Sequence, residues 1–167
     1  GDRFGVSVAL EGDTALIGAP WDNDSCSNDT DSACGAAYVY TRFGSTWFQQ
    51  QKLIADDGSG NDHFGNSVAL DGETAMIGSV DDRDTCITTS SGIGCGAVYV
   101  FTKFGNTWTQ QQKLASEDPD GRHRFGHSIA LDDNTALISE YISGGEACEQ
   151  GRDIECTVVY LFTRSGN

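Results

Sequence analysis

The chain has 167 residues, and 25 acidic against 10 basic side chains give it a formal net charge of −15 at pH 7. This acidity argues against nucleic acid or an anionic membrane as a partner, because both attract basic surfaces. The sequence has no run of about 18 apolar residues, so we expect no membrane-spanning helix. The 21 glycines and two prolines suit short strands joined by tight turns.

The chain contains three copies of one sequence unit. Phe-Gly pairs at Phe4-Gly5, Phe64-Gly65 and Phe125-Gly126 open similar stretches, and these start 60 and 61 residues apart. A period of this length, filled with strand-like sequence, is typical of repeat proteins whose units bury their faces against one another. We therefore expect three units, at 1–60, 61–121 and 122–167.

Each unit carries the patterns of β-strands. In the first unit, residues 6–10 (VSVAL) alternate between large apolar and small side chains, and a Glu-Gly-Asp turn separates them from the apolar run 14–19. Aromatic and β-branched residues predict further strands at 36–42 and 47–53. No stretch has helical periodicity over a useful length, so we expect an all-β fold. Four antiparallel strands per repeat predict β-propeller blades, whereas a β-sandwich needs no repeat and a β-helix has shorter ones.

The third unit ends at Ser165-Gly166-Asn167, where the second unit continues through Thr107-Trp108 into a fourth strand. Propellers close with about four to eight blades, so three blades do not form a ring. We therefore expect a window of a longer repeat protein, or a chain that its neighbours complete. In the second case the open strand edge of the third unit accepts a strand from another chain.

The cysteines occur as one pair per unit, always in the same connection. Their spacings of eight and nine residues lack the Cys-x-x-Cys pattern of zinc sites, which favours disulfides. Disulfides imply an oxidising compartment, so the chain is expected to be secreted or on a cell surface. Asn-x-Ser/Thr triplets at Asn23 and Asn28 are predicted glycosylation sites. The expected pairs are Cys26–Cys34, Cys86–Cys95 and Cys148–Cys156.

The motifs of the first unit, Phe4-Gly5 followed by Gly18-Ala19-Pro20, resemble the FG-GAP repeat, which forms the blades of the integrin α-chain propeller. The second unit has Gly78-Ser79-Val80 in the second position, and the third has Ser139-Glu140-Tyr141. The resemblance implies propeller blades with a role in adhesion or protein recognition. Integrin-type units bind calcium between their first two strands, but that connection is too short here to surround an ion.

All long connections of such blades emerge on one face, and the other face has only tight turns. Loops held by a rigid scaffold are where binding usually occurs, so we expect any ligand on the long-loop face. Trp47 and Trp108 occupy equivalent positions and are expected to pack between blades, whereas Trp21 is unrepeated and either contacts a ligand or covers its own blade. The candidate ligand-binding residues are Trp21, Asp22, Asp24, Asp81, Asp82 and Asp84.

The dense carboxylates of the first loop also suggest a calcium site, against the simpler interpretation of solvated acidic loops. Its candidate ligands are Asp22, Asp24, Asp29 and Asp31, and no other cofactor is expected. No nucleophile elbow or zinc-protease motif is present, so catalysis is not expected. The expected function is adhesion or protein recognition, with other proteins or further copies of the chain as partners. The alternatives are a structural subunit of a glycosylated extracellular filament or surface layer, and a glycan-binding propeller.

Overall fold

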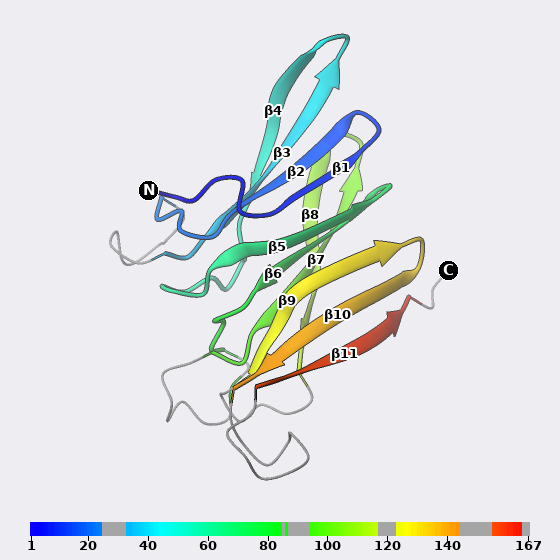
Figure 1. Cartoon of the computed structure of the whole chain (residues 1–167). Coiled ribbons are helices and arrows are strands. Elements are labelled where there is room, and N and C mark those ends of the chain that lie inside the picture. Colours follow the sequence, from blue (N-terminus) through cyan, green and yellow to red (C-terminus); the bar gives the residue numbers. More distant parts are fainter. Residues whose placement is uncertain (25–32, 85, 87–93, 117–122, 144–154, 165–167) are drawn as a thin grey trace.

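The computed structural model describes residues 1–24, 33–84, 86, 94–116, 123–143 and 155–164. The described residues are all-β and contain no helix, as the sequence predicts (Figure 1). Accordingly, no described segment is a helix of the length and apolarity needed to cross a membrane. The strands are β1 (Val8–Glu11), β2 (Thr14–Ala19), β3 (Ala36–Phe43), β4 (Thr46–Leu53), β5 (Phe64–Asp71), β6 (Thr74–Ser79), β7 (Ala97–Phe104), β8 (Thr107–Ala115), β9 (His123–Asp132), β10 (Thr135–Ile142) and β11 (Cys156–Thr163).

The strands form three antiparallel sheets, one for each repeat of the sequence. Strands β1–β4 make the sheet that we call blade 1, β5–β8 make blade 2, and β9–β11 make blade 3. Neighbouring strands pair in chain order within each sheet, and the sheets lie face to face in succession (Figure 1). The prediction of tandem propeller-like blades is therefore confirmed.

Two-residue turns join the first two strands of every blade. The turns follow the pairs Glu11↔Thr14, Asp71↔Thr74 and Asp132↔Thr135. Their first residues have positive φ values of 53° at Gly12, 55° at Gly72 and 51° at Asp133. Tight hairpins need this backbone conformation, which glycine adopts without strain and aspartate tolerates.

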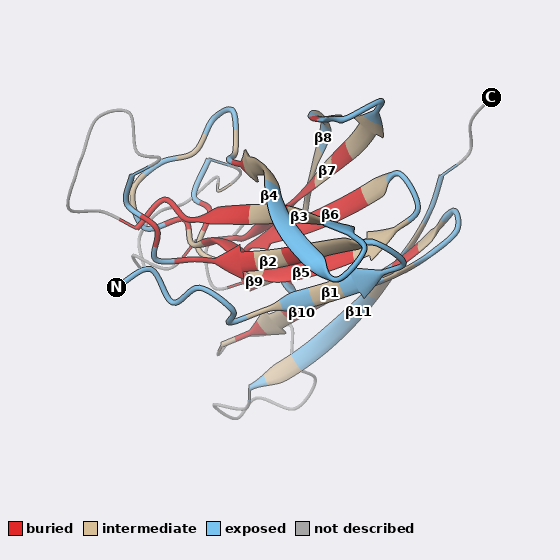
Figure 2. Cartoon of the chain, turned by 90° about the horizontal axis from the view of Figure 1, so that it is seen from above, coloured by how far each residue is buried: buried red, intermediate tan, exposed pale blue. Residues whose placement is uncertain are grey.

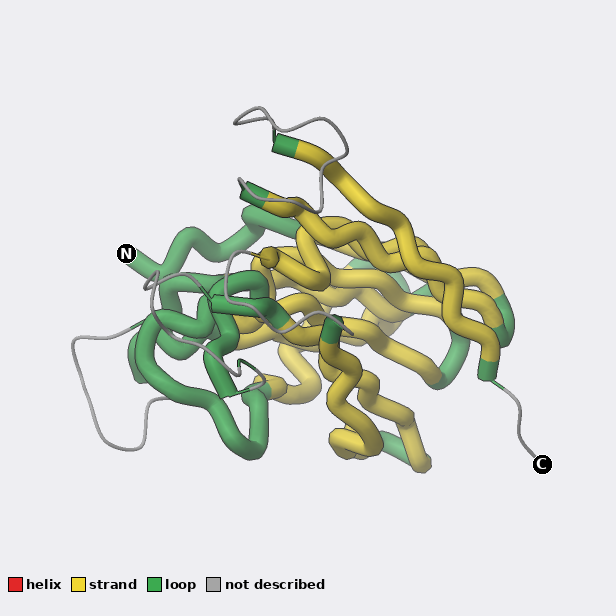
Figure 3. Tube along the Cα trace, turned by 90° about the horizontal axis from the view of Figure 1, so that it is seen from below, coloured by secondary structure: helices red, strands yellow, loops and turns green. Residues whose placement is uncertain are grey.

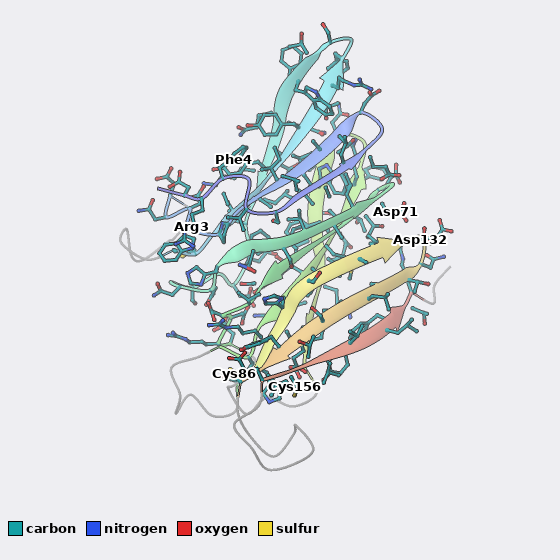
Figure 4. All side chains as sticks on the ribbon, viewed as in Figure 1. Arg3, Phe4, Asp71, Cys86, Asp132 and Cys156 are labelled. Atoms are coloured by element: carbon teal, nitrogen blue, oxygen red, sulfur yellow. A yellow bond between two sulfur atoms is a disulfide. The ribbon has the colours of Figure 1, made fainter. Side chains whose placement is uncertain are left out.

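The two ends of the blades differ strongly. The strand ends and described residues at which the β2–β3, β6–β7 and β10–β11 connections and both links between blades begin and end lie at one end of the blades, which we call the loop face (Figure 3). The hairpin turns lie at the other end, which we call the turn face. Figure 4 shows Cys86 and Cys156 near the loop face, and Asp71 and Asp132 at the turn face. The described ends of the long connections therefore lie on one surface.

The hydrophobic core lies between the blades rather than within one sheet. Blade 2 is covered on both sides, and its Ile77, Val98 and Tyr99 are each 0% exposed. The outermost strands β1 and β11 are largely exposed (Figure 2). Burial of apolar surface stabilises by roughly 25 cal/mol per Å², so most of the stability of each blade comes from its neighbours.

The Phe-Gly motif of each blade approaches the backbone of the blade before it. Gly65 and Gly126 have φ values of 93° and 85°, and their carbonyl oxygens accept hydrogen bonds from the hydroxyls of the preceding blade, Ser7 at 2.8 Å and Ser67 at 2.6 Å. A Cβ atom added at Gly18 would lie only 1.9 Å from the Gly65 oxygen. At the equivalent Gly78 it would lie 2.4 Å from the Gly126 oxygen. Glycine at Gly18 and Gly78, in the second motif of the repeat, is thus required for contact between blades.

The phenylalanine of the same motif packs into its own blade. Phe64 makes edge contacts with Tyr99 and Phe101, with ring centroids 5.4 and 6.1 Å apart. Phe125 contacts Tyr160 and Phe162 in the same way at 5.6 and 6.1 Å. The motif therefore joins two adjacent sheets, through its aromatic ring on one side and its glycine carbonyl on the other.

Blade 3 lacks the glycines against which, in blades 1 and 2, the Phe-Gly motif of the following blade packs. Ser139 stands where blades 1 and 2 have Gly18 and Gly78. Thr157 stands where they have Gly35 and Gly96, which form parallel bridges to Phe64 and Phe125 of the following blade. The receiving surface that blades 1 and 2 share is consequently altered in blade 3.

The close approach of the Gly126 carbonyl to Gly78 predicts that one added methyl group will destabilise the fold. We expect Gly78→Ala to lower the free energy of unfolding by about 2 kcal/mol or more, because the Gly126 carbonyl is backbone and must shift. Urea denaturation measures the change. Gly58→Ala is the control, because its Cβ would meet its nearest atom at 3.3 Å, and its expected effect is below about 0.5 kcal/mol. Equal effects of the two substitutions would contradict the docking role.

Candidate functional site

Two of the long loops begin at buried aspartates that hold them against the sheet. Asp22 follows β2 and is 1% exposed, and Asp82 follows β6 and is 0% exposed. Asp82 accepts hydrogen bonds from the Tyr99 hydroxyl at 2.6 Å and from the Lys113 ammonium at 3.0 Å. Asp22 accepts the same bonds from Tyr38 and, at 2.9 Å, from Lys52. In blades 1 and 2 the last two strands thus supply the partners of the loop aspartate.

The same aspartates organise the backbone at both ends of their loops. The Asp82 carboxylate accepts the Asp84 N–H at 3.0 Å, and the Asp82 carbonyl oxygen accepts the Cys95 N–H at 2.9 Å. Asp22 is bonded equivalently to the N–H groups of Asp24 and Gly35, at 3.0 and 2.9 Å. A buried carboxyl group is costly to the fold unless it is hydrogen-bonded, and each of these two has several partners, so these two aspartates act as loop anchors.

In blade 3 a different residue supplies the buried carboxylate. Ser143 stands at the position of Asp82, and the carboxylate comes instead from Glu140 of β10, which is 0% exposed. The Tyr160 hydroxyl donates to Glu140 at 2.6 Å, and His123 Nδ1 lies 3.1 Å from it. The tyrosine of the third strand in every blade, in β3, β7 and β11, therefore has a buried carboxylate partner.

Lys113 is the centre of an acidic cluster. Its ammonium lies 2.8 Å from Asp57, 3.0 Å from Asp82 and 3.8 Å from Asp84. Burial by itself lowers the pKa of Lys113, but the hydrogen bond with Asp57 and the charge of Asp82 raise it above the ordinary lysine value. Burial, followed by the nearby Asp82, raises the pKa of Tyr99, which keeps its hydroxyl as a donor.

Asp62 is a buried carboxyl group beside this cluster, and it is 2% exposed. It accepts the Ser59 N–H at 2.6 Å, while its own carbonyl oxygen accepts the Ser79 hydroxyl at 2.8 Å. Burial raises the pKa of Asp62 to about 7; the Ser59 bond lowers it and the charge of Asp82 adds to the rise. Asp62 therefore titrates near neutral pH.

A continuous row of side chains crosses all three blades on the loop face. The Arg3 guanidinium lies 4.3 Å from the centre of the Trp21 ring, which lies 5.1 Å from the His63 ring of the next blade. His63 Nδ1 is 2.7 Å from Asp81, and Arg124 of blade 3 is 3.2 Å from the same carboxylate. We call Arg3, Trp21, His63, Asp81 and Arg124 the loop-face row.

Backbone geometry and charge hold this row in place. Arg3 and His63 precede the Phe-Gly motifs of their blades and have positive φ values of 52° and 58°, which are uncommon for these residue types. Partial burial raises the pKa of Asp81, but the hydrogen bond from His63 and the charge of Arg124 outweigh it and lower the pKa overall. Asp81 therefore stays ionised to a lower pH than an ordinary aspartate, between His63 of blade 2 and Arg124 of blade 3.

The structure places the predicted site residues in different environments. Trp21 is 43% exposed, and Asp24 and Asp84 are exposed, whereas Asp22 and Asp82 are buried among their own partners and present no open carboxylate. Asn23 is exposed. In the described part of the chain, no group of three or more metal-ligating side chains is found. Cys26, Asn28, Asp29, Asp31 and Cys148 lie outside the described residues.

A disulfide closes the loop of blade 2. It joins Cys86 to Cys95, with Cα atoms 5.6 Å apart. Cys34 and Cys156, the second cysteines of the other two loops, are also disulfide-bonded. The loop that follows Asp82 is thus fixed twice near the sheet, by the Asp82 hydrogen bonds and by the disulfide.

These features define a class of protein: tandem β-propeller-like blades joined through repeated Phe-Gly contacts, with their long loops on one face. The model of the FG-GAP repeat matches residues 1–40, 47–101 and 108–152, so the chain belongs to the FG-GAP repeat family. A search of curated proteins finds no significant match to the chain.

The anchor network predicts a large cost when Lys113 is neutralised. We expect Lys113→Met to lower the free energy of unfolding by about 3–5 kcal/mol, because Asp82 is left buried without its cation. Chemical denaturation measures the loss. Adding Asp82→Asn to the same protein removes the unpaired charge and should restore part of it. A cost below about 1 kcal/mol for the single change would show that Asp82 does not depend on Lys113.

The raised pKa of Asp62 predicts a pH dependence of stability. An aspartate whose folded pKa is about 7 stabilises the fold while protonated, and this contribution is lost as the pH rises from about 4 through 7. Between pH 5 and pH 8 we therefore expect Asp62→Asn to gain about 2 kcal/mol relative to the unsubstituted chain. Unfolding curves at both pH values measure this difference. The exposed Asp56 supplies the control, because Asp56→Asn should show no such gain.

Proposed function

We propose that this FG-GAP chain is a non-catalytic extracellular module for adhesion or protein recognition, and that it binds through its loop face. The observation that carries the proposal is the loop-face row, which spans the three blades. Loops on a rigid sheet scaffold are common places for binding. The Cys86–Cys95 disulfide supports an extracellular location, because such bonds persist in oxidising compartments.

The chemistry of the row suits a protein partner. The exposed Trp21 ring offers a large apolar surface, and the Arg3 guanidinium stacked on it offers several N–H donors. Tryptophan and arginine are among the residue types most enriched in binding hot spots. Asp81 and Arg124 add opposite charges at the far end, which favours one orientation of a partner. Glycan binding is less well supported, because Asp81 and Ile142 replace Trp21 in the other blades, so the stacking residue is not repeated.

The experiment compares two tryptophans of similar exposure at opposite ends of blade 1. Trp21 on the loop face is 43% exposed, and Trp47 near the turn face is 39% exposed; both lie under an arginine. We expect Trp21→Ala to weaken saturable binding of the labelled chain to the surface of its source cells by about tenfold or more. Trp47→Ala should change it less than about twofold.

Both variants are first compared with the unsubstituted chain by melting temperature, so that loss of fold is not mistaken for loss of binding. Equal effects of the two substitutions, or the absence of saturable binding, would contradict the loop-face proposal.

A structural role in an extracellular assembly is the second candidate. Its supporting observation is the pair of apolar outer surfaces: Val8 and Leu10 of β1 are 68% and 71% exposed, and Val159 and Leu161 of β11 are 60% and 66% exposed. Exposed apolar side chains grouped on one strand are typical of interaction surfaces. Electron microscopy of the purified chain distinguishes the two candidates, because the structural role predicts ordered polymers and adhesion through the loop face does not.

A further inference from the structure

The link between blades 1 and 2, residues 54–63, makes a tight corner before it enters β5. The Asp62 carboxyl group accepts the Ser59 N–H at 2.6 Å, and the Asp62 N–H donates to the Ser59 carbonyl at 3.4 Å. Asn61 and His63, on either side of Asp62, have positive φ values of 69° and 58°. This backbone conformation is uncommon for residues other than glycine. The corner places the Asp62 side chain inside the protein, where it is 2% exposed.

The backbone of Asp62 holds two members of the loop-face row. His63 follows it in the chain, and the Asp62 carbonyl oxygen accepts the Asp81 N–H at 3.3 Å and the Ser79 hydroxyl at 2.8 Å. His63 Nδ1 and the Asp81 carboxylate are in turn 2.7 Å apart, and the His63 ring lies beside Trp21. A displacement of Asp62 therefore moves the centre of the row.

The surroundings of the Asp62 carboxyl group are acidic. The negative charges of Asp82 and Asp84 lie near it, and Lys113 is the cation that offsets them. However, the Lys113 ammonium is already shared among Asp57, Asp82 and Asp84, at 2.8, 3.0 and 3.8 Å. The titratable and charged groups of the elements packed here are Asp57 and His63 of the link, Asp81, Asp82 and Asp84 after β6, Tyr99 of β7 and Lys113 of β8.

Ionisation of Asp62 adds a further negative charge to this buried region. Burial raises the pKa of Asp62 to about 7; the Ser59 bond lowers it and the charge of Asp82 adds to the rise. An exposed aspartate, by contrast, ionises near pH 4. A state in which the link is open and Asp62 meets water therefore releases the proton more readily than the closed state. As the pH rises from about 4 through 7, opening of the link becomes steadily more favourable.

We propose that the 54–63 link is a pH-sensitive latch of the loop-face row, which is closed while Asp62 carries its proton and opens more readily once Asp62 is ionised. Opening breaks the bonds of the Asp62 carbonyl oxygen to Ser79 and Asp81, and it takes His63 away from Trp21. The row is thus held more firmly in mildly acidic surroundings than above neutral pH. The latch acts with or without a bound partner, so it does not depend on the proposed adhesion function.

Hydrogen exchange of the link amides tests the latch. We expect the protection of the Ser59, Asp62 and Asp81 N–H groups, corrected for intrinsic exchange, to fall by about tenfold between pH 6 and pH 8. Asp62→Asn retains an oxygen that accepts the Ser59 N–H but cannot ionise, so its protection should stay constant over this range. Asp56→Asn, at an exposed position of the same link, is the matched control and should show the fall of the unsubstituted chain.

A second variant tests the same carboxyl group without changing it. Asp84 is on the surface, with its side chain 44% exposed, and its charge raises the pKa of Asp62. We therefore expect Asp84→Asn to move the fall in protection to lower pH. The result also decides the proposal if Asp62→Asn does not fold, because a fall that stays at the same pH would mean that Asp62 does not control it.

Two further outcomes would overturn the latch. One is an equal response to pH of the unsubstituted chain and Asp62→Asn. The other is protection of the link amides as high as that of the core amides of β6 and β7, because the link would then open only when the whole chain unfolds.

Discussion

The docking of a glycine carbonyl against the glycine of the preceding blade is the contact on which this structure depends. A serine hydroxyl of one blade, Ser7 or Ser67, binds the carbonyl oxygen of Gly65 or Gly126 in the next. Because backbone meets backbone here, neither partner has a side chain that can adjust. The contact fixes the distance between sheets, and the large apolar residues on both sides then fill the space that this distance leaves.

The charged groups near the loop face have a different role from the core. Asp82, Tyr99 and Lys113 form a buried network whose net contribution to stability is small compared with the penalty for breaking it. Such a network holds the start of a long loop in one position relative to the sheet. Asp22 is held in the same way in blade 1, next to the exposed Trp21 on which Arg3 stacks; Figure 4 labels Arg3. The loop face thus combines rigid anchors with exposed contact residues.

The sequence predicts the fold well because short stretches of the sequence indicate its strands and turns. The repeat period, the alternation of residues 6–10 and the Gly12 turn each indicate strands and hairpins without knowledge of distant contacts. The site is harder to predict, because it depends on which side chains the fold buries and which it leaves exposed. Asp22 and Asp24 look alike in the sequence, yet one is buried on Lys52 and the other is exposed. The loop-face row joins residues of three repeats, and only the stacking of the blades brings them together.

Other signals were present in the sequence but needed the structure for their interpretation. The Gln-Gln-Gln run of β4 binds the strand of the next blade, through Gln50 to the Asn106 carbonyl at 2.7 Å and through Gln51 to Trp108. Glu140, an acid within an otherwise small and apolar motif, is the partner that Tyr160 requires in the absence of a loop aspartate. In both cases the residue type was unusual for its position, and its partner came from elsewhere in the fold.

Ser139 and Thr157 make one side of blade 3 different from the corresponding sides of blades 1 and 2. Blades 1 and 2 admit a following unit because glycine leaves its carbonyl room, while blade 3 carries β-carbons at those same two points. An identical unit cannot be added there by the same contact without displacing backbone. A unit packed against that side would meet side chains rather than bare glycine backbone, so its contact with blade 3 would differ from the contacts that join the first three blades.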